Sequence, residues 1–145
     1  NLQAAVGLAQ LEKIDEYVNC RIGNAKKYNR ELLNVKGITL PPEADWAKNV
    51  YWMYGILIQK EFGMSMHKLR EELTKKGIDT RTFFIGMHKQ PAYKGKDRRF
   101  PSLNGKYPVS DELESKGLYL PSSSHLSKEN IVLIANTIKD IKENL

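Results

Sequence analysis

The longest regular pattern lies at the start of the chain. Between residues 2 and 34, apolar side chains recur every three to four positions, the spacing of one helix face, and Gly37 follows as a stop signal. This pattern predicts one long helix. Over residues 2–11 it is apolar nearly all round, with only Gln3 and Gln10 as polar interruptions. A helix of that kind needs cover on several sides, so we expect a partner surface against it.

Strand-like and helix-like segments alternate in the middle of the chain. Residues 50–59 are rich in aromatic and β-branched side chains, which favour a strand. Ser65 then supplies an N-cap oxygen for a helix over residues 66–76, and residues 78–85 return to a strand pattern. This order predicts a compact α/β unit.

Shorter elements complete the predicted fold. The pattern indicates extended pieces at residues 38–40 and 118–121, a loop at residues 94–107, a short helix at residues 111–116 and a final helix at residues 128–144. We therefore predict one α+β domain over residues 1–145, in which helices pack against a small, mainly antiparallel sheet that follows the long first helix.

Composition limits the class of protein. A hydrophobic share of 41% in 145 residues suffices for one core, and no apolar stretch approaches the roughly 20 residues of a membrane helix. We expect no signal peptide or anchor, because the segment that begins at Asn1 has no basic region before an apolar one. The single cysteine, Cys20, excludes an internal disulfide. We therefore expect a reducing compartment, by default the cytoplasm.

The formal net charge of +6 raises the question of an acidic partner. The basic residues fall into separate groups: Lys26, Lys27 and Arg30 share a helical segment with Glu31, whereas Lys94, Lys96, Arg98 and Arg99 lie in the loop rich in Gly and Pro. The first group is typical of a solvated helix face. The second could approach a phosphorylated ligand or simply be solvated. Neither forms the continuous basic stripe of a nucleic-acid-binding domain.

Side chains suited to a polar ligand concentrate between residues 80 and 93. Arg81 offers a planar fork for a carboxylate or phosphate. Phe83 and Phe84 offer flat apolar surface. His88 and Gln90 offer hydrogen bonds that can orient a ligand. The same residues are also typical of a buried aromatic pair beside a surface turn, so the run by itself leaves both interpretations open.

The residues needed for catalysis are incomplete. Cys20 lies within a helical pattern with no histidine nearby in sequence, so it lacks the base that a nucleophile needs. His67, His88 and His125 stand far apart, without cysteine or acidic partners at metal-binding spacing. No glycine-rich phosphate loop is present. The chain therefore offers a binding surface without a catalytic set, and we expect no metal.

Several segments, in order, resemble the DegT/DnrJ/StrS sugar aminotransferases. They are residues 1–11 (NLQAAVGLAQL), 50–54 (VYWMY), 77–84 (GIDTRTFF), 87–91 (MHKQP) and 117–122 (GLYLPS). Together they cover almost the whole chain. The form Phe-Phe-Ile-Gly-Met-His is most similar to the perosamine synthase branch, although many members of the family have proline at the position of Gly86.

The resemblance implies the small C-terminal domain of a fold type I enzyme that depends on pyridoxal phosphate. In that family the cofactor lysine belongs to a larger N-terminal domain, and no lysine of this chain stands in its Schiff-base context. The implied enzyme is a cytoplasmic homodimer that transfers an amino group from glutamate to a nucleotide-linked keto-deoxysugar, in lipopolysaccharide or other cell-surface polysaccharide biosynthesis. We therefore expect a fragment without a catalytic residue of its own, inactive alone.

The resemblance also implies roles for residues of the run. Arg81 would bind an anionic group, either the donor carboxylate or the substrate phosphate. Phe83 or Phe84 would form a wall, and only one would reach the site because successive strand residues face opposite sides. His88 would hydrogen-bond the sugar or phosphate, with Gln90 and Tyr93 as weaker candidates. Two alternatives remain: a noncatalytic interaction or dimerisation module, and, with less support, a nucleic-acid-binding domain.

Overall fold

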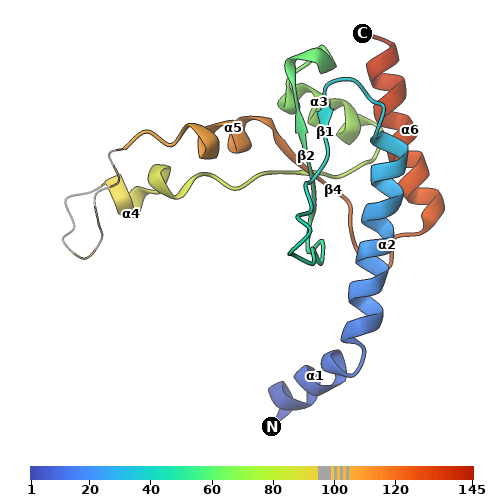
Figure 1. The fold of residues 1–145 in the computed structure, drawn as a ribbon, viewed down its shortest axis with the longest axis vertical. Coiled ribbons are helices and arrows are strands. Elements are labelled where there is room, and N and C mark those ends of the chain that lie inside the picture. Colours follow the sequence, from blue (N-terminus) through green and yellow to red (C-terminus); the bar gives the residue numbers. More distant parts are fainter. Residues whose placement is uncertain (95–98, 100, 102, 104) are drawn as a thin grey trace.

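The structure is a computed structural model that describes residues 1–94, 99, 101, 103 and 105–145 (Figure 1). Its helices are α1 (Leu2–Leu11), α2 (Ile14–Leu32), α3 (Met66–Lys75), α4 (Pro91–Lys94), α5 (Pro108–Lys116) and α6 (Lys128–Glu143). Its strands are β1 (Ile38–Thr39), β2 (Tyr54–Ile58), β3 (Arg81–Thr82) and β4 (Gly117–Leu120), and short 3-10 turns occur at η1 (Lys60–Phe62) and η2 (Met87–Lys89).

The described strands form a four-stranded sheet in the order β1-β2-β4-β3. Every neighbouring pair is antiparallel, with Ile56 opposite Leu118 and Arg81 opposite Tyr119. Strands β2 and β3 flank α3 in the sequence but do not pair, because β4 from the last third of the chain lies between them. The predicted α+β fold with an antiparallel sheet is confirmed.

One face of the sheet carries the core. Alternate residues of β2, including Ile56, point to this face and are buried. They meet the apolar stripes of α3 and α6, exemplified by Leu69 and Ile138, and the inner side of α2 at Tyr28. Full burial of such a side chain contributes about 1.5–3 kcal/mol. The bounds predicted for the helices at 66–76 and 128–144 are confirmed to within one residue.

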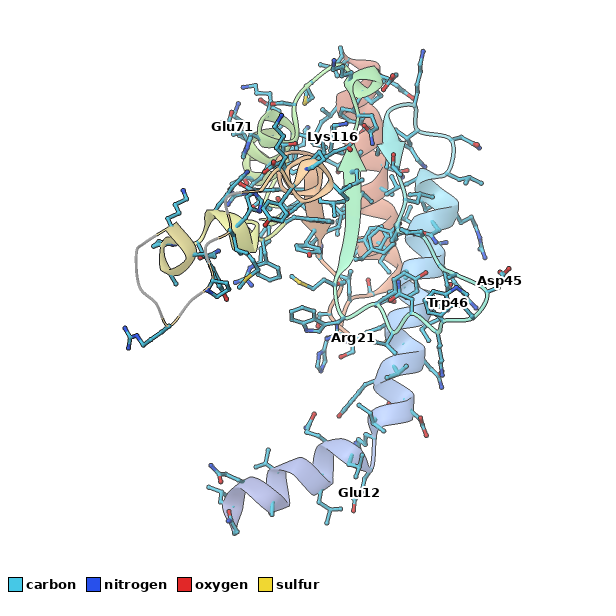
Figure 2. The ribbon with its side chains drawn as sticks, turned by 60° about the vertical axis from the view of Figure 1, so that its left-hand side comes forward. Glu12, Arg21, Asp45, Trp46, Glu71 and Lys116 are labelled. Carbon is cyan, nitrogen blue, oxygen red and sulfur yellow. The ribbon has the colours of Figure 1, made fainter. Side chains whose placement is uncertain are left out.

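The predicted single helix over residues 2–34 is wrong. The chain turns at Glu12 and Lys13, where the Lys13 backbone (φ −113°, ψ 10°) leaves the helical region, and Glu12 marks this bend in Figure 2. No residue of α1 is buried among the described residues, so little packing holds α1 in line with α2. The apolar periodicity passes through the bend and therefore could not reveal it.

An arm leaves the sheet after β3. It comprises η2, α4 and α5 and extends away from the layer of α2 and α6 (Figure 1). The strand predicted over residues 78–85 is therefore too long: its described ladder ends where the Phe83 amide donates to the Gly117 carbonyl (3.1 Å). The strand predicted over residues 50–59 likewise shortens to β2, and α5 begins three residues before the predicted 111. Lys96 and Arg98 of the predicted basic loop lie outside the described residues.

Candidate functional site

A cavity of about 740 Å³ lies at one end of the sheet, between β3, β4 and α6. Arg81 lines it from the edge strand, Ser122 and Ser123 line it from the loop after β4, and Met53 and Leu133 add apolar surface. The lining thus combines apolar walls with a few polar groups, as is typical of a small-molecule site.

Arg81 supplies a cation to this cavity. It is exposed at the start of the short edge strand β3, and within the described part of the chain it has no ion pair or hydrogen bond through its side chain. An unpaired guanidinium beside a cavity can bind a carboxylate or phosphate through two parallel hydrogen bonds. Arg81 is therefore the predicted site residue that the structure places in a cavity.

The two phenylalanines both contact Tyr119 but differ in exposure. Phe83 stacks on Tyr119, with ring centroids 4.3 Å apart and an interplanar angle of 17°, and its ring covers the sheet above Gly55 and Gly117. The Phe84 side chain is 65% exposed and only tilts toward Tyr119 (6.0 Å). Phe83 therefore covers the outer face of the sheet, and Phe84 is the ring available to another molecule.

His88 belongs to a polar cluster within the arm, away from the cavity lining. Its Nε2 lies 3.0 Å from Oδ1 of Asp111, and its ring stacks on Tyr107. Lys89 joins the same carboxylate (2.7 Å) to Glu114 (3.0 Å). These contacts link η2 to α5 within the arm. In the sequence, Asp111 and Glu114 stand out only as acidic residues near a helix N-terminus, and their pairing has no local signal.

The pKa values of both carboxyl groups are lowered in this cluster. For Asp111 the largest cause is the hydrogen bond from Lys89. For Glu114 it is the Gly86 amide, which donates to Oε2 at 3.1 Å, followed by Lys89. The cluster therefore favours ionised carboxylates that tie the arm together.

The remaining predicted residues also lie in the arm. Gln90 Nε2 donates to the Ile85 carbonyl (3.3 Å), and Tyr93 lies half-buried in α4. The structure thus distributes the predicted site residues over two regions, with Arg81 at the cavity and His88, Gln90 and Tyr93 in the arm. Their spacing within one short run did not indicate this separation.

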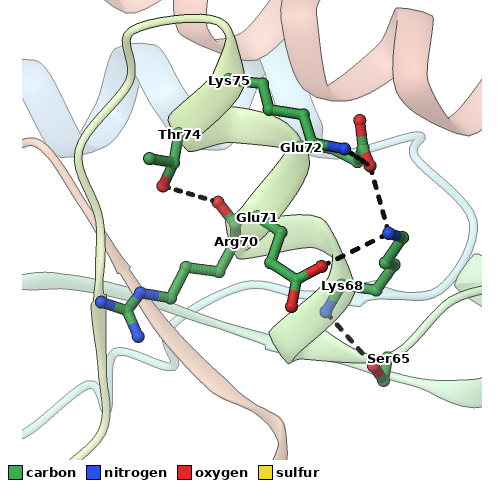
Figure 3. Close-up of polar contacts among 7 residues, drawn as sticks. All are labelled: Ser65, Lys68, Arg70, Glu71, Glu72, Thr74 and Lys75. Carbon is green, nitrogen blue, oxygen red and sulfur yellow. Dashed lines mark hydrogen bonds and ion pairs between the residues drawn. The ribbon is translucent and has the colours of Figure 1, made fainter.

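The exposed face of α3 carries a network of ion pairs between its own side chains. Lys68 pairs with Glu71 (3.3 Å) and Glu72 (3.4 Å), and Lys75 pairs with Glu72 (2.9 Å), as Figure 3 shows. The Ser65 side chain accepts from the Lys68 amide (3.3 Å) and caps the helix. Such pairs at helical spacing are common on solvated faces.

Pyridoxal phosphate needs a lysine for its covalent attachment. Among the described residues no lysine lines the cavity around Arg81, and Lys89 is paired with two carboxylates in the arm. This residue set does not fit the cofactor by itself. The described residues also contain no group of three or more acidic, histidine or cysteine side chains that could hold a metal, and none of the described helices is long and apolar enough to cross a membrane.

Solved structures define the class of protein. S. venezuelae DesV superposes with a TM-score of 0.84 at 26% identity, over 99% of this chain and 36% of that one. A DegT DnrJ EryC1 StrS aminotransferase from Brucella abortus superposes with a TM-score of 0.80 at 26% identity, over 97% and 35% of the two chains. The fold is that of one part of an aminotransferase.

The sequence comparison specifies the family. The model of the DegT/DnrJ/EryC1/StrS aminotransferase family matches residues 1–139, and the chain belongs to that family. Its relatives include the GDP-perosamine synthases of Escherichia coli O157:H7 (30% identity over 140 residues) and Vibrio cholerae (29% over 140 residues). The match covers 97% of this chain in both cases, but only 35% and 36% of the relatives. The resemblance noted in the sequence is confirmed, and the chain spans about a third of those relatives.

Proposed function

We propose that residues 1–145 are the small C-terminal domain of a longer aminotransferase that depends on pyridoxal phosphate. The family match over residues 1–139 supports this, as does the share of about a third that the chain covers in its relatives. The cavity around Arg81 has no lysine among its described lining residues. On this proposal the remainder of the longer protein holds the cofactor, and this chain alone is inactive.

The proposed reaction moves an amino group from glutamate to a nucleotide-linked keto-deoxysugar. The observation that carries it is the similarity to GDP-perosamine synthases over 97% of the chain. Bound pyridoxal phosphate would supply the carbanion chemistry. Arg81 would hold the anionic group of one substrate in the cavity, and Phe84 and His88 would contact the sugar from the arm, with Gln90 and Tyr93 beside them. A product of this kind suits cell-surface polysaccharide biosynthesis in the cytoplasm.

A homodimer is part of the same proposal. Helix α1 exposes Leu2 (82%) and Leu11 (65%), and the arm exposes Met87 (60%) and Val109 (69%). Monomeric proteins rarely leave such apolar surfaces uncovered. We assign these two surfaces to the partner subunit and to the larger domain of the longer protein. An interaction module without enzyme activity would expose the same surfaces, so activity decides between the two.

The test uses the full-length protein that contains this chain. With glutamate and a GDP- or dTDP-linked keto-deoxysugar, we expect transamination, and we expect none from the 145 residues alone. Arg81→Ala should lower kcat/KM about 100-fold, since a charged hydrogen-bonding group contributes about 1.5–3 kcal/mol. Its melting temperature should stay unchanged.

Arg70→Ala is the matched control, because Arg70 is also exposed and lies on the solvated face of α3 (Figure 3). If the full-length protein transaminates none of these nucleotide sugars, the interaction module is favoured. Unchanged kinetics of Arg81→Ala would remove Arg81 from the site and leave the reaction standing.

A further inference from the structure

The loop after β4 is fastened to α2 by an unbroken series of hydrogen bonds. Consecutive backbone carbonyls accept from side chains of one helix: Pro121 from Tyr28 Oη (2.9 Å), Ser122 from Arg21 Nη1 (3.3 Å), Ser123 from Asn24 Nδ2 (3.1 Å) and Ser124 from Cys20 Sγ (3.1 Å). Three of these donors recur every four residues and so share a helix face. Burial raises the pKa of the Tyr28 hydroxyl, which keeps that donor protonated.

Arg21 also holds a second loop. The same Nη1 donates to the Trp52 carbonyl at 2.8 Å, and Figure 2 shows Arg21 where α2 meets the rest of the molecule. The preceding residue, Tyr51, has φ 47°, an unfavourable left-handed conformation for a bulky side chain. Such a conformation costs about 1–3 kcal/mol and persists only where the surroundings impose it.

Contacts of Tyr51 also hold this second loop. The Tyr51 amide donates to Oδ1 of Asn49 (2.9 Å), its hydroxyl donates to Glu43 (3.2 Å), and its ring is buried. Trp52 is then presented with 68% of its side chain exposed. A fixed, strained backbone that presents an exposed aromatic residue is typical of functional loops.

Both loops border the cavity of Arg81. Met53 lines it from the loop before β2, and Ser122 and Ser123 line it from the loop after β4. No described residue of α2 lines this cavity, so the carbonyls that α2 binds direct their negative ends toward α2. A carbonyl oxygen turned into the cavity would repel an anion beside Arg81. The bridge made by Arg21 therefore affects both the shape and the electrostatics of the cavity.

We propose that Arg21 is a positioning residue for this anion-binding cavity. Its guanidinium fixes the Trp52 and Ser122 carbonyls together, which sets the distance between the two loops and keeps both carbonyl oxygens away from the ligand. The identity of the ligand rests on the proposed function: it is the substrate whose binding Arg81→Ala weakens. Arg21 acts through the loops and does not touch the substrate.

Kinetics of the full-length protein test the ligand part. Arg21→Met should raise the KM of that substrate about tenfold, the order expected when a charged hydrogen-bond donor is lost, with kcat almost unchanged. Arg21→Lys keeps the charge, but its Nζ ends one bond short of the position of Nη1, the atom that reaches both carbonyls, so it should retain most of the defect. Arg30→Met, an exposed arginine on the same helix, is the control. An unchanged KM in Arg21→Met, or full recovery in Arg21→Lys, would overturn the proposal.

Amide hydrogen exchange tests the positioning without any substrate. In Arg21→Met and Arg21→Lys, amides of residues 50–53 and 122–124 should exchange faster, while those of α6 around Ile138 stay protected. Equal exchange in wild type and both variants would refute the role of Arg21 even if the enzyme is active. Faster exchange in a protein that turns over no nucleotide sugar would support the positioning role while the proposed reaction fails.

Discussion

Glycine is required at position 117 by the ring of Phe83 and not by the backbone. The φ and ψ of Gly117 are −80° and 128°, values that any residue adopts. A β-carbon there would lie 2.1 Å from Cγ of Phe83, and one at Gly55 would lie 2.6 Å from its Cζ. Gly117→Ala must therefore displace the ring and disturb its stacking on Tyr119 (4.3 Å).

The free energy of unfolding measures this contact. Overpacking of this kind costs about 1–3 kcal/mol, and loss of an aromatic pair costs a further ~0.5–1.5 kcal/mol. We expect Gly117→Ala to destabilise the protein by about 2 kcal/mol in urea unfolding. In a Phe83→Ala background the same change should be nearly neutral, because the added methyl group then meets empty space. The coupling energy of this double-mutant cycle should thus approach the full cost of the single change.

Gly23→Ala is the matched control. Gly23 lies inside α2, and a β-carbon added there would meet no atom within 4 Å, so alanine should stabilise the helix by about 0.5–1 kcal/mol. The expected changes in the free energy of unfolding thus have opposite signs at Gly23 and Gly117, which distinguishes an effect of helix propensity from a steric conflict. An equal cost of Gly117→Ala with and without the Phe83 ring would refute the reasoning.

Two further changes test the cavity wall and the arm. The Thr80 hydroxyl oxygen is buried and has no hydrogen-bond partner among the described residues. Thr80→Val should therefore stabilise the protein by about 1 kcal/mol in thermal unfolding, whereas Thr80→Ser should not. Destabilisation by valine would contradict the absence of a partner. The pKa values of Asp111 and Glu114 are lowered beside Lys89. The stability that these ionised carboxylates contribute is therefore complete above their ordinary pKa values of 3.8 and 4.5, and it is lost as the pH falls through their lowered pKa values. In Lys89→Met, the free energy of unfolding should depend less on pH below about 4.5. The same pH dependence in wild type and variant would contradict the role of Lys89 in lowering these pKa values.

The helices could be predicted from the sequence where the apolar stripe of a single element determines which face is buried. The stripes around Leu69 and Ile138 predicted α3 and α6 because a helix with one apolar face must place it against the core. Prediction from the sequence failed at Lys13, where no residue of α1 is buried and no proline or glycine marks the bend. It also overextended β3, because an edge strand lasts only as long as its neighbour offers partners, and β4 ends its pairing near Gly117.

The candidate site was predicted in composition but not in arrangement. Arg81 lies directly opposite Tyr119 on the neighbouring strand, and Phe83 stacks on the same Tyr119 ring, so Tyr119 lies between the cavity at Arg81 and the ring of Phe83. This arrangement depends on the pairing of β3 with β4, a long-range contact that local patterns do not encode. For the same reason, the bridge from Arg21 to Trp52 and Ser122 had no signal in the sequence.

The exposed apolar surfaces and the core belong to different parts of the molecule. Assembly of the longer protein and stability of this domain can therefore be tested separately. The core lies between the sheet and α2, α3 and α6. Helix α1 has no buried residue, and the arm carries its own ion-pair network around Lys89. Polar substitutions at Leu2 or Val109 should therefore weaken assembly of the full-length protein without unfolding this domain, whereas Phe83→Ala should lower the stability of the domain itself. Separate measurements of the oligomeric state and of the free energy of unfolding distinguish a surface that binds a partner from one that only supports the fold.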